Sequence, residues 1–145
     1  MLVPMTNQPQ PISVRRITVE RDRLVCEVCI PDARFRYSNV SLGALVKATY
    51  PDLVHHACVN EVSNRFVDVI DETSIPHMLE HIVIDEQIRI SRGADRFVGA
   101  TEWTCEQKGE ATVQLSFADD LEALRALKKA LAFLNTSLIG LATDS

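Results

Sequence analysis

Apolar and polar residues alternate along four segments of the chain, which is the pattern of a β-strand with one buried face. The four segments are 12–20, 23–30, 97–107 and 110–117. Arg21-Asp22 separates the first two segments, and Lys108-Gly109 separates the last two. A short break of this kind between two alternating runs is typical of a hairpin turn. The sequence therefore predicts two β-hairpins, one early and one late in the chain.

Three other segments place apolar residues three and four positions apart, as an amphipathic α-helix does. The first is 39–51, with Ser41 as its expected N-cap and Pro51 after its end. The second is 75–91, which is followed by a glycine-containing loop. The third occupies the end of the chain and is the longest of the three.

This last helix is expected to begin at Asp119 or Asp120, either of which suits a helix N-terminus. Its leucines follow the helical spacing and are expected to face the core. They are Leu121, Leu124, Leu127, Leu131 and Leu134. The stripe is too short for a coiled coil, so the helix is expected to pack on the rest of the domain.

Three segments carry weaker signals. Segment 33–38 follows the turn signal Pro31-Asp32 and is interpreted as a third strand. Segment 56–60 is interpreted as a short strand. Segment 65–72 alternates like a strand but also suits a loop or a helical turn, so its structure stays open.

The combined order of elements predicts an α+β fold, in which a mostly antiparallel sheet packs against two or three helices. The length of 145 residues is that of one ordinary domain, and 46% hydrophobic residues suffice for a core. We expect a single domain over 12–145. Residues 1–11 hold three of the six prolines and are expected to form a flexible lead-in.

The charge and hydropathy of the chain limit the kinds of molecule that it is expected to bind. The net charge is −5, and the longest basic run is Arg15-Arg16, so a nucleic-acid partner is not expected. No window has the length of a membrane-spanning helix, and the N-terminus lacks the features of a signal peptide. We therefore expect a cytoplasmic protein with reduced cysteines and no membrane partner.

The predicted helix 75–91 holds the strongest candidate chemistry. His77, His81 and Asp85 follow one another at intervals of four residues and so lie along one helix face. Glu80 lies beside them. Imidazole and carboxylate groups are zinc ligands, and two histidines one helical turn apart can bind one ion. The pattern predicts a zinc site at which Glu80 is the general base that activates water.

The run His77-Met78-Leu79-Glu80-His81 has the order H-x-x-E-H of one class of zinc peptidases. Asp85 is the expected third ligand by its spacing. Inverzincins, the peptidases with this order, take that ligand from a more distant glutamate, and this chain offers three alternatives. They are Glu102, Glu106 and Glu110. The alternative to a metal site is that both histidines belong to an ordinary helix face.

The segment PHMLEHIVIDEQIR (76–89) resembles the H-x-x-E-H-x-x-x-E-x-Q segment in the N-terminal domain of cyanophycin synthetase and its stand-alone relatives. A Thr-x-Trp strand at 101–103 and the helix and cysteine-containing strand at 41–60 also resemble that domain. The resemblance extends from about residue 12 to residue 138. The ATP-grasp and Mur-ligase-like modules of the full synthetase are absent, so no polymer synthesis is expected.

The resemblance implies a zinc-dependent, metallopeptidase-like site that acts on a peptide or isopeptide bond, such as one in an Asp/Arg-type polymer. His77 and His81 would be ligands and Glu80 the base. Asp85 stands at the second acidic position of the pattern and Gln87 at its glutamine, and Trp103 is expected to line the pocket with Gln87. Because other members use this domain to bind or assemble, a non-catalytic peptide-binding or assembly module, in the form of a homodimer, is the alternative.

Two other groups of candidate ligands have simpler interpretations. Cys26 and Cys29 lie three residues apart in a predicted strand, so they point to opposite faces and are expected to be core residues. His55, His56 and Cys58 could bind a metal, but the sequence offers no second cysteine or histidine pair to complete a structural zinc set. A surface or strand-edge position is expected for these three.

Overall fold

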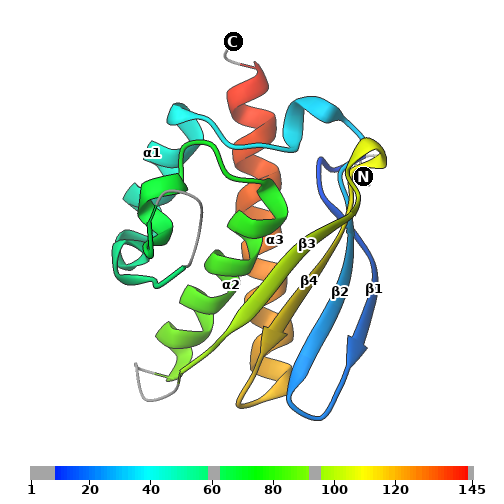
Figure 1. Cartoon of the computed structure of the whole chain (residues 1–145), viewed down its shortest axis with the longest axis vertical. Coiled ribbons are helices and arrows are strands. Elements are labelled where there is room, and N and C mark those ends of the chain that lie inside the picture. Colours follow the sequence, from blue (N-terminus) through cyan, green and yellow to red (C-terminus); the bar gives the residue numbers. More distant parts are fainter. Residues whose placement is uncertain (1–8, 59–62, 92–95, 144–145) are drawn as a thin grey trace, which may run out of the picture.

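The structure is a computed structural model that describes residues 9–58, 63–91 and 96–143. Its sheet has four antiparallel strands in the order β1-β2-β4-β3 (Figure 1). The strands are β1 (Ser13–Val19), β2 (Arg23–Cys29), β3 (Gly99–Cys105) and β4 (Glu110–Ser116). Both predicted hairpins are therefore confirmed, and they pair with each other through β2 and β4.

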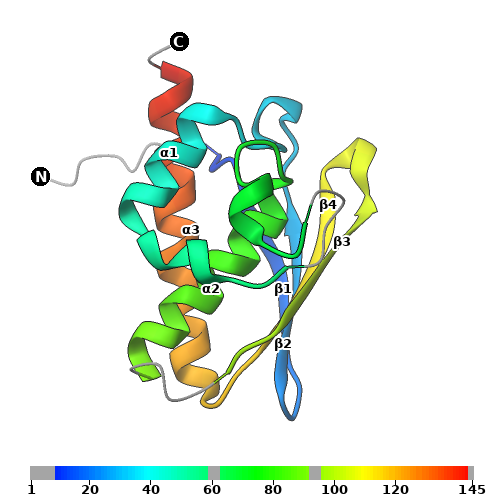
Figure 2. The ribbon, with the colours of Figure 1, turned by 60° about the vertical axis from the view of Figure 1, so that its left-hand side comes forward.

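Three helices lie together on one side of this sheet, which gives the predicted α+β architecture (Figure 2). They are α1 (Val40–Thr49), α2 (Ile75–Ser91) and α3 (Asp120–Thr143). Helix α2 contacts β3, β4 and α3 and is the central element of the fold. Every side chain from position 75 to position 87 except His77 is buried, so this helix is enclosed almost completely.

Alternate residues of the two central strands face the helices. Leu24, Cys26 and Val28 of β2 are buried, as are Val113 and Leu115 of β4. Such side chains each contribute about 1.5–3 kcal/mol when fully buried. The expectation that Cys26 and Cys29 are core residues is confirmed, since both are 2% exposed or less. Burial raises the pKa of the Cys26 thiol to about 11, which makes this thiol unreactive at neutral pH.

The segment before α1 and the N-cap of α1 both differ from the prediction. Segment 33–38 is not a strand, because Ala33–Phe35 forms a 3-10 helix that Asp32 caps. Helix α1 is capped by Asn39, whose side chain accepts a hydrogen bond of 2.9 Å from the Leu42 amide. Asparagine is as good an N-cap as serine, and the prediction of Ser41 was therefore wrong by two residues.

The structure also shows the conformation of the segments whose sequence signals were weak. Phe66–Val69 forms a 3-10 helix, which settles the open interpretation of 65–72 in favour of a helical turn. Ala57 makes an isolated antiparallel bridge with Arg65, and the predicted strand at 56–60 lies partly outside the described residues. In α3 the prediction that Leu121 faces the core was wrong, because this side chain is 61% exposed at the first turn of the helix.

The turn between β3 and β4 requires glycine. Gly109 has φ 72°, and a Cβ at this position would lie 1.9 Å from the carbonyl oxygen of Ile30. Arg36 holds the same region together, because its guanidinium donates to the backbone carbonyls of Ile30, Pro31 and Glu106. The described helices include none that is long and apolar enough to cross a membrane.

Candidate metal centre

The first turn of α2 fixes the direction in which its histidines point. Ser74 caps the helix, since the His77 amide donates to its Oγ over 3.3 Å, and Pro76 lies in the first turn. His77 and His81 then follow on successive turns, with their ring centroids 4.8 Å apart.

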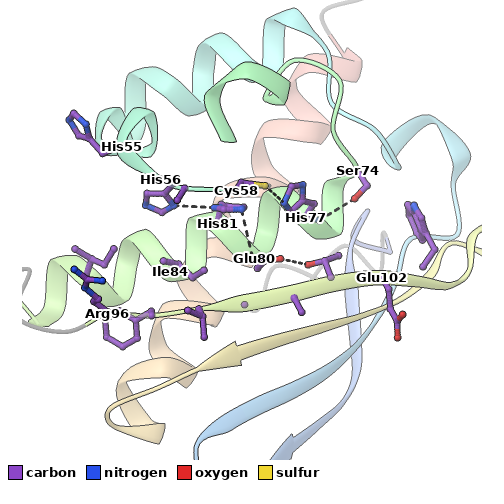
Figure 3. Close-up of a pocket in the computed structure, with 18 residues that line it drawn as sticks. His55, His56, Cys58, Ser74, His77, Glu80, His81, Ile84, Arg96 and Glu102 are labelled. Carbon is purple, nitrogen blue, oxygen red and sulfur yellow. Dashed lines mark hydrogen bonds and ion pairs between the residues drawn. The ribbon is translucent and has the colours of Figure 1, made fainter. Parts of the chain in front are cut away.

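Cys58 lies opposite these two histidines (Figure 3). One ligand atom each from Cys58, His77 and His81 lies within 4.8 Å of the other two, and Cys58 Sγ is 3.4 Å from His77 Nε2. The thiol reaches this position because its segment crosses the exposed side of α2, where the Cys58 amide donates to the carbonyl oxygen of Asn64.

Both imidazoles are packed and held. Thr73 Oγ1 lies 2.7 Å from His77 Nδ1, which leaves the Nε2 atom of this ring directed at Cys58. The ring of Phe66 stacks on His81 with centroids 4.0 Å apart and contacts the His77 ring edge-on at 5.1 Å. This packing holds the ring planes in place before any ligand binds.

Burial also sets the protonation state of both rings. Desolvation lowers the pKa of His77, and desolvation together with the neighbouring His77 and His56 lowers the pKa of His81 to about 2. Both rings are therefore neutral at physiological pH. A neutral imidazole is the form that binds a metal ion.

Glu80 lies beside the two histidines on the side of the sheet. Its Oε1 accepts a hydrogen bond of 2.7 Å from Thr101 Oγ1 on β3, and its Oε2 is 3.6 Å from His81 Nε2. Glu80 is only 5% exposed, and this burial raises the pKa of Glu80 while the hydrogen bond from Thr101 partly opposes the rise. A carboxyl group with a raised pKa is suited to exchange protons near neutral pH.

A pocket of about 1030 Å³ opens over these residues. Its floor is α2, one wall is the segment 55–58, and the other wall is the continuous segment 96–103 that includes most of β3 (Figure 3). Trp103 lies in this wall. Gly99 lies where a Cβ would come within 2.7 Å of Glu80 Cγ, so the wall can approach the carboxylate only because this residue is glycine.

Two imidazoles and a thiol now face one another at the bottom of a pocket, with a carboxylate beside them. The model of the cyanophycin synthase-like N-terminal domain matches residues 40–139, which include all of these residues. The chain belongs to this family. No curated protein matches the sequence. The family match covers all three helices at least in part, and it spans β3 and β4, so it includes both walls of the pocket.

The donor set of Cys58, His77 and His81 could hold a metal ion. Neutral imidazole nitrogen and cysteine sulfur are the ligand atoms that Zn²⁺ takes in proteins, and three of them leave a fourth position open to water or substrate. Cys58, His77 and His81 could together hold such an ion. Thr73 would then be the outer hydrogen-bond partner that fixes the ring of His77.

The carboxylates that the sequence offered as third ligand lie elsewhere. Asp85 Oδ1 is 3.3 Å from His56 Nε2, and Asp85 is not part of the three-residue group. Glu102 lines the pocket, Glu106 accepts a hydrogen bond from Tyr37, and Glu110 pairs with Arg15. Geometrically, Cys58 takes the place that the helical spacing had suggested for Asp85.

Gln87 also lies away from the pocket. Its side chain is 3% exposed, and its Nε2 donates a hydrogen bond of 3.1 Å to the Ser116 carbonyl at the end of β4. It therefore joins α2 to the sheet and is not among the residues that line the pocket.

Cys58 and His56 were not predicted as part of this site, because no second pair of ligands stands close to them in the sequence. The signal was present as His-His-x-Cys at 55–58, nineteen residues before His77. A surface or strand-edge position was expected for His55, His56 and Cys58, and Ala57 within this segment forms an isolated bridge with Arg65. What the sequence could not show is that this segment crosses over the face of α2 that carries the histidines.

Proposed function

We propose that this domain binds zinc through Cys58, His77 and His81 and hydrolyses a peptide or isopeptide bond. The observation that carries the proposal is the convergence of these three ligand atoms within 4.8 Å at the bottom of a pocket that also holds Glu80. Bound zinc would supply a Lewis acid that lowers the pKa of water and polarises the substrate carbonyl.

Glu80 is the proposed general base. The carboxylate removes a proton from the attacking water while the water oxygen bonds to the carbonyl carbon. When the C–N bond breaks, Glu80 gives this proton to the leaving nitrogen. Thr101 holds Oε1 in place, so Oε2, which faces His81, is the oxygen that takes and returns the proton.

The open edge of β3 supports a peptide as substrate. Within the described residues β3 pairs only with β4. The Ser116 amide donates to the Val98 carbonyl, and because hydrogen-bonded pairs alternate along an antiparallel ladder, the backbone groups of Gly99, Thr101 and Trp103 point to the open edge. An extended peptide can pair with such an edge. Thr101 also contacts Glu80, so a peptide bound there would pass the proposed base.

The charges on this wall support a substrate with both acidic and basic groups. Arg96 and Glu102 lie toward opposite ends of the pocket-lining segment 96–103 (Figure 3). A guanidinium binds a carboxylate, and a carboxylate binds a guanidinium. An Asp/Arg-type polymer, or a related peptide, would offer both groups, and this is the substrate class that the family suggests.

The test combines metal analysis with hydrolysis. Purified protein should contain close to one zinc per chain, and His81→Ala should lose it. A panel of Asp/Arg dipeptides and short peptides should be cleaved by the zinc-loaded protein and not by Glu80→Gln, which should keep its zinc. A peptide with a methylated backbone nitrogen on the side that pairs with β3 should bind at least tenfold more weakly.

The outcomes separate the two functions that the sequence allowed. Loss of cleavage in a zinc-loaded Glu80→Gln protein supports hydrolysis. Peptide binding that is unchanged in Glu80→Gln, with no cleavage by the native protein, would show a non-catalytic binding module. A native protein that takes up no zinc when purified in its presence would overturn the metal site itself.

A further inference from the structure

Asp85, His56 and His81 are linked by successive side-chain contacts. Asp85 is 1% exposed, and its two oxygens contact different residues, Oδ2 as part of an ion pair and Oδ1 as part of a hydrogen bond. Oδ2 is 3.2 Å from Arg89 Nε, and Oδ1 is 3.3 Å from His56 Nε2. The side chain of His56 is 8% exposed, so this contact is also shielded from water.

The second contact of His56 joins two identical atoms. His56 Nδ1 lies 3.1 Å from His81 Nδ1, a contact drawn as a dashed line in Figure 3. In neutral imidazoles one ring nitrogen carries a hydrogen and the other accepts one. Of these two Nδ1 atoms, therefore, one donates and the other accepts, and something must decide which.

Asp85 decides the direction. A carboxylate can only accept, and Arg89 can only donate, so the hydrogen between Asp85 and His56 sits on His56 Nε2. When His56 is neutral, its Nδ1 is then an acceptor, and His81 Nδ1 must carry the hydrogen that it accepts. The Nε2 atom of His81 is left with a free lone pair, on the side of the ring that faces Glu80.

We propose that Asp85 and His56 are positioning residues that fix the tautomer of His81 and so present its Nε2 lone pair to the metal. This role rests on the proposed zinc site, but the tautomer itself is a property of the metal-free protein. The contact on the other histidine is different, because the Thr73 hydroxyl next to His77 can either donate or accept and does not impose a direction.

The decisive variant is Asp85→Asn, which keeps the shape and reverses the hydrogen bond. The positive charge of Arg89 favours the amide oxygen of the asparagine over its NH₂ group at the position of Oδ2, so the NH₂ group will face His56 Nε2. His56 must then carry its hydrogen on Nδ1, and His81 must accept there and carry its own hydrogen on Nε2. The atom proposed to bind the metal would be blocked.

The tautomers are read by NMR. Protein labelled with ¹⁵N-histidine is stripped of metal, and two-bond ¹H–¹⁵N correlations report which nitrogen of each ring is protonated. His81 should carry its hydrogen on Nδ1 in the native protein and on Nε2 in Asp85→Asn. The same tautomer in both proteins would overturn the proposal, as would a native His81 with its hydrogen on Nε2.

Zinc affinity supplies the second readout, measured by competition with a chelating dye. Asp85→Asn should weaken zinc binding by roughly 10–100-fold, the range usual for outer partners of a metal-bound histidine. Glu86→Gln is the matched control, because Glu86 is an equally buried neighbour that pairs with Arg89 and Lys129 but not with His56. An equal loss in Glu86→Gln would assign the effect to buried charge and overturn the proposal.

A double-mutant cycle covers the case in which Asp85→Asn alters the fold. His56→Phe keeps a ring beside His81 but removes the link to Asp85. In that background, Asp85→Asn should have no further effect on zinc affinity, and additive losses would overturn the proposal. If no variant bound zinc, the proposed function would fail, while the NMR experiment would still decide the tautomer.

Discussion

Thr101 on the edge strand β3 donates a hydrogen bond of 2.7 Å to Glu80 on the central helix α2. This contact joins the wall of the pocket to the carboxylate proposed to act as base. It also opposes part of the rise that burial causes in the pKa of Glu80. The strand therefore both orients this carboxylate and adjusts its acidity.

Thr101→Val should raise the pKa of Glu80 further, because burial would act without the opposing hydrogen bond. The acidic limb of the pH–rate profile should move to higher pH, and stability should fall by about 1–3 kcal/mol for the lost hydrogen bond to a buried carboxylate. Steady-state kinetics across pH and urea unfolding measure the two effects. Thr104→Val, an exposed change on the same strand, should alter neither.

Cys58→Ser should weaken zinc binding by more than the roughly 10–100-fold typical of an outer partner, because a metal ligand itself is changed. A neutral hydroxyl is a much poorer zinc ligand than a thiolate. Competition with a chelating dye gives the affinity. Cys105→Ser, a change at a half-buried cysteine outside the pocket, is the control, and an equal loss of zinc there would argue against Cys58 as a ligand.

The metal-free protein should lose stability as the pH falls below about 6.5. His81 has an ordinary pKa of 6.5 and a folded pKa of about 2, so the unfolded chain binds this proton more readily than the folded protein. The contribution is complete above pH 6.5 and is lost on acidification at up to about 1.4 kcal/mol per pH unit. Urea unfolding at pH 7.5 and pH 5.5 measures the loss.

Glu80 acts on stability in the opposite sense, because its folded pKa is raised above the ordinary 4.5. Its contribution is present at low pH and is lost as the pH rises through the folded pKa. The histidine effect is therefore best measured in a Glu80→Gln background. His81→Gln in that background should flatten the pH dependence, and an unchanged slope would show that His81 is protonated in the folded state.

Gly99→Ala should destabilise the protein by about 1–3 kcal/mol, as overpacking does elsewhere. The added methyl group would lie 2.7 Å from Glu80 Cγ and 2.9 Å from the Gln114 carbonyl oxygen. Gly140→Ala is the matched control, since nothing lies within 4 Å of its Cβ and alanine favours a helix. Thermal unfolding should show a lower Tm for the first variant and an equal or higher Tm for the second.

Much of the fold is predictable because its signals are local. The alternation in β2 and β4 predicts which face of each strand is buried, and the structure agrees. In β1 the same alternation does not correspond to a buried face, because no residue of this strand is buried. The wrong predictions of secondary structure also have a local cause. Ala33–Phe35 alternates like a strand, but its backbone follows Asp32, whose side chain caps a helical turn.

The candidate site was predictable only where its residues share one helix. His77, Glu80 and His81 follow from the period of α2 alone. Cys58 and His56 do not, because their position depends on how segment 55–58 crosses α2. Spacing on the helix suggested Asp85 as a ligand, whereas the structure places His56 between Asp85 and the group around His81.

Helix α2 is enclosed on nearly every side, and the same helix supplies both histidines and the glutamate. The same helix therefore supports both the fold and the proposed site. A bulkier or shorter side chain along it would disturb the packing of the core and the geometry of the site together. Substitutions that alter the chemistry of the site without disturbing the core must therefore keep the volume of the side chain they replace. Relatives without the proposed catalytic activity should accordingly still show α2 in the same place, with its nitrogen, oxygen or sulfur donors replaced by groups of equal size.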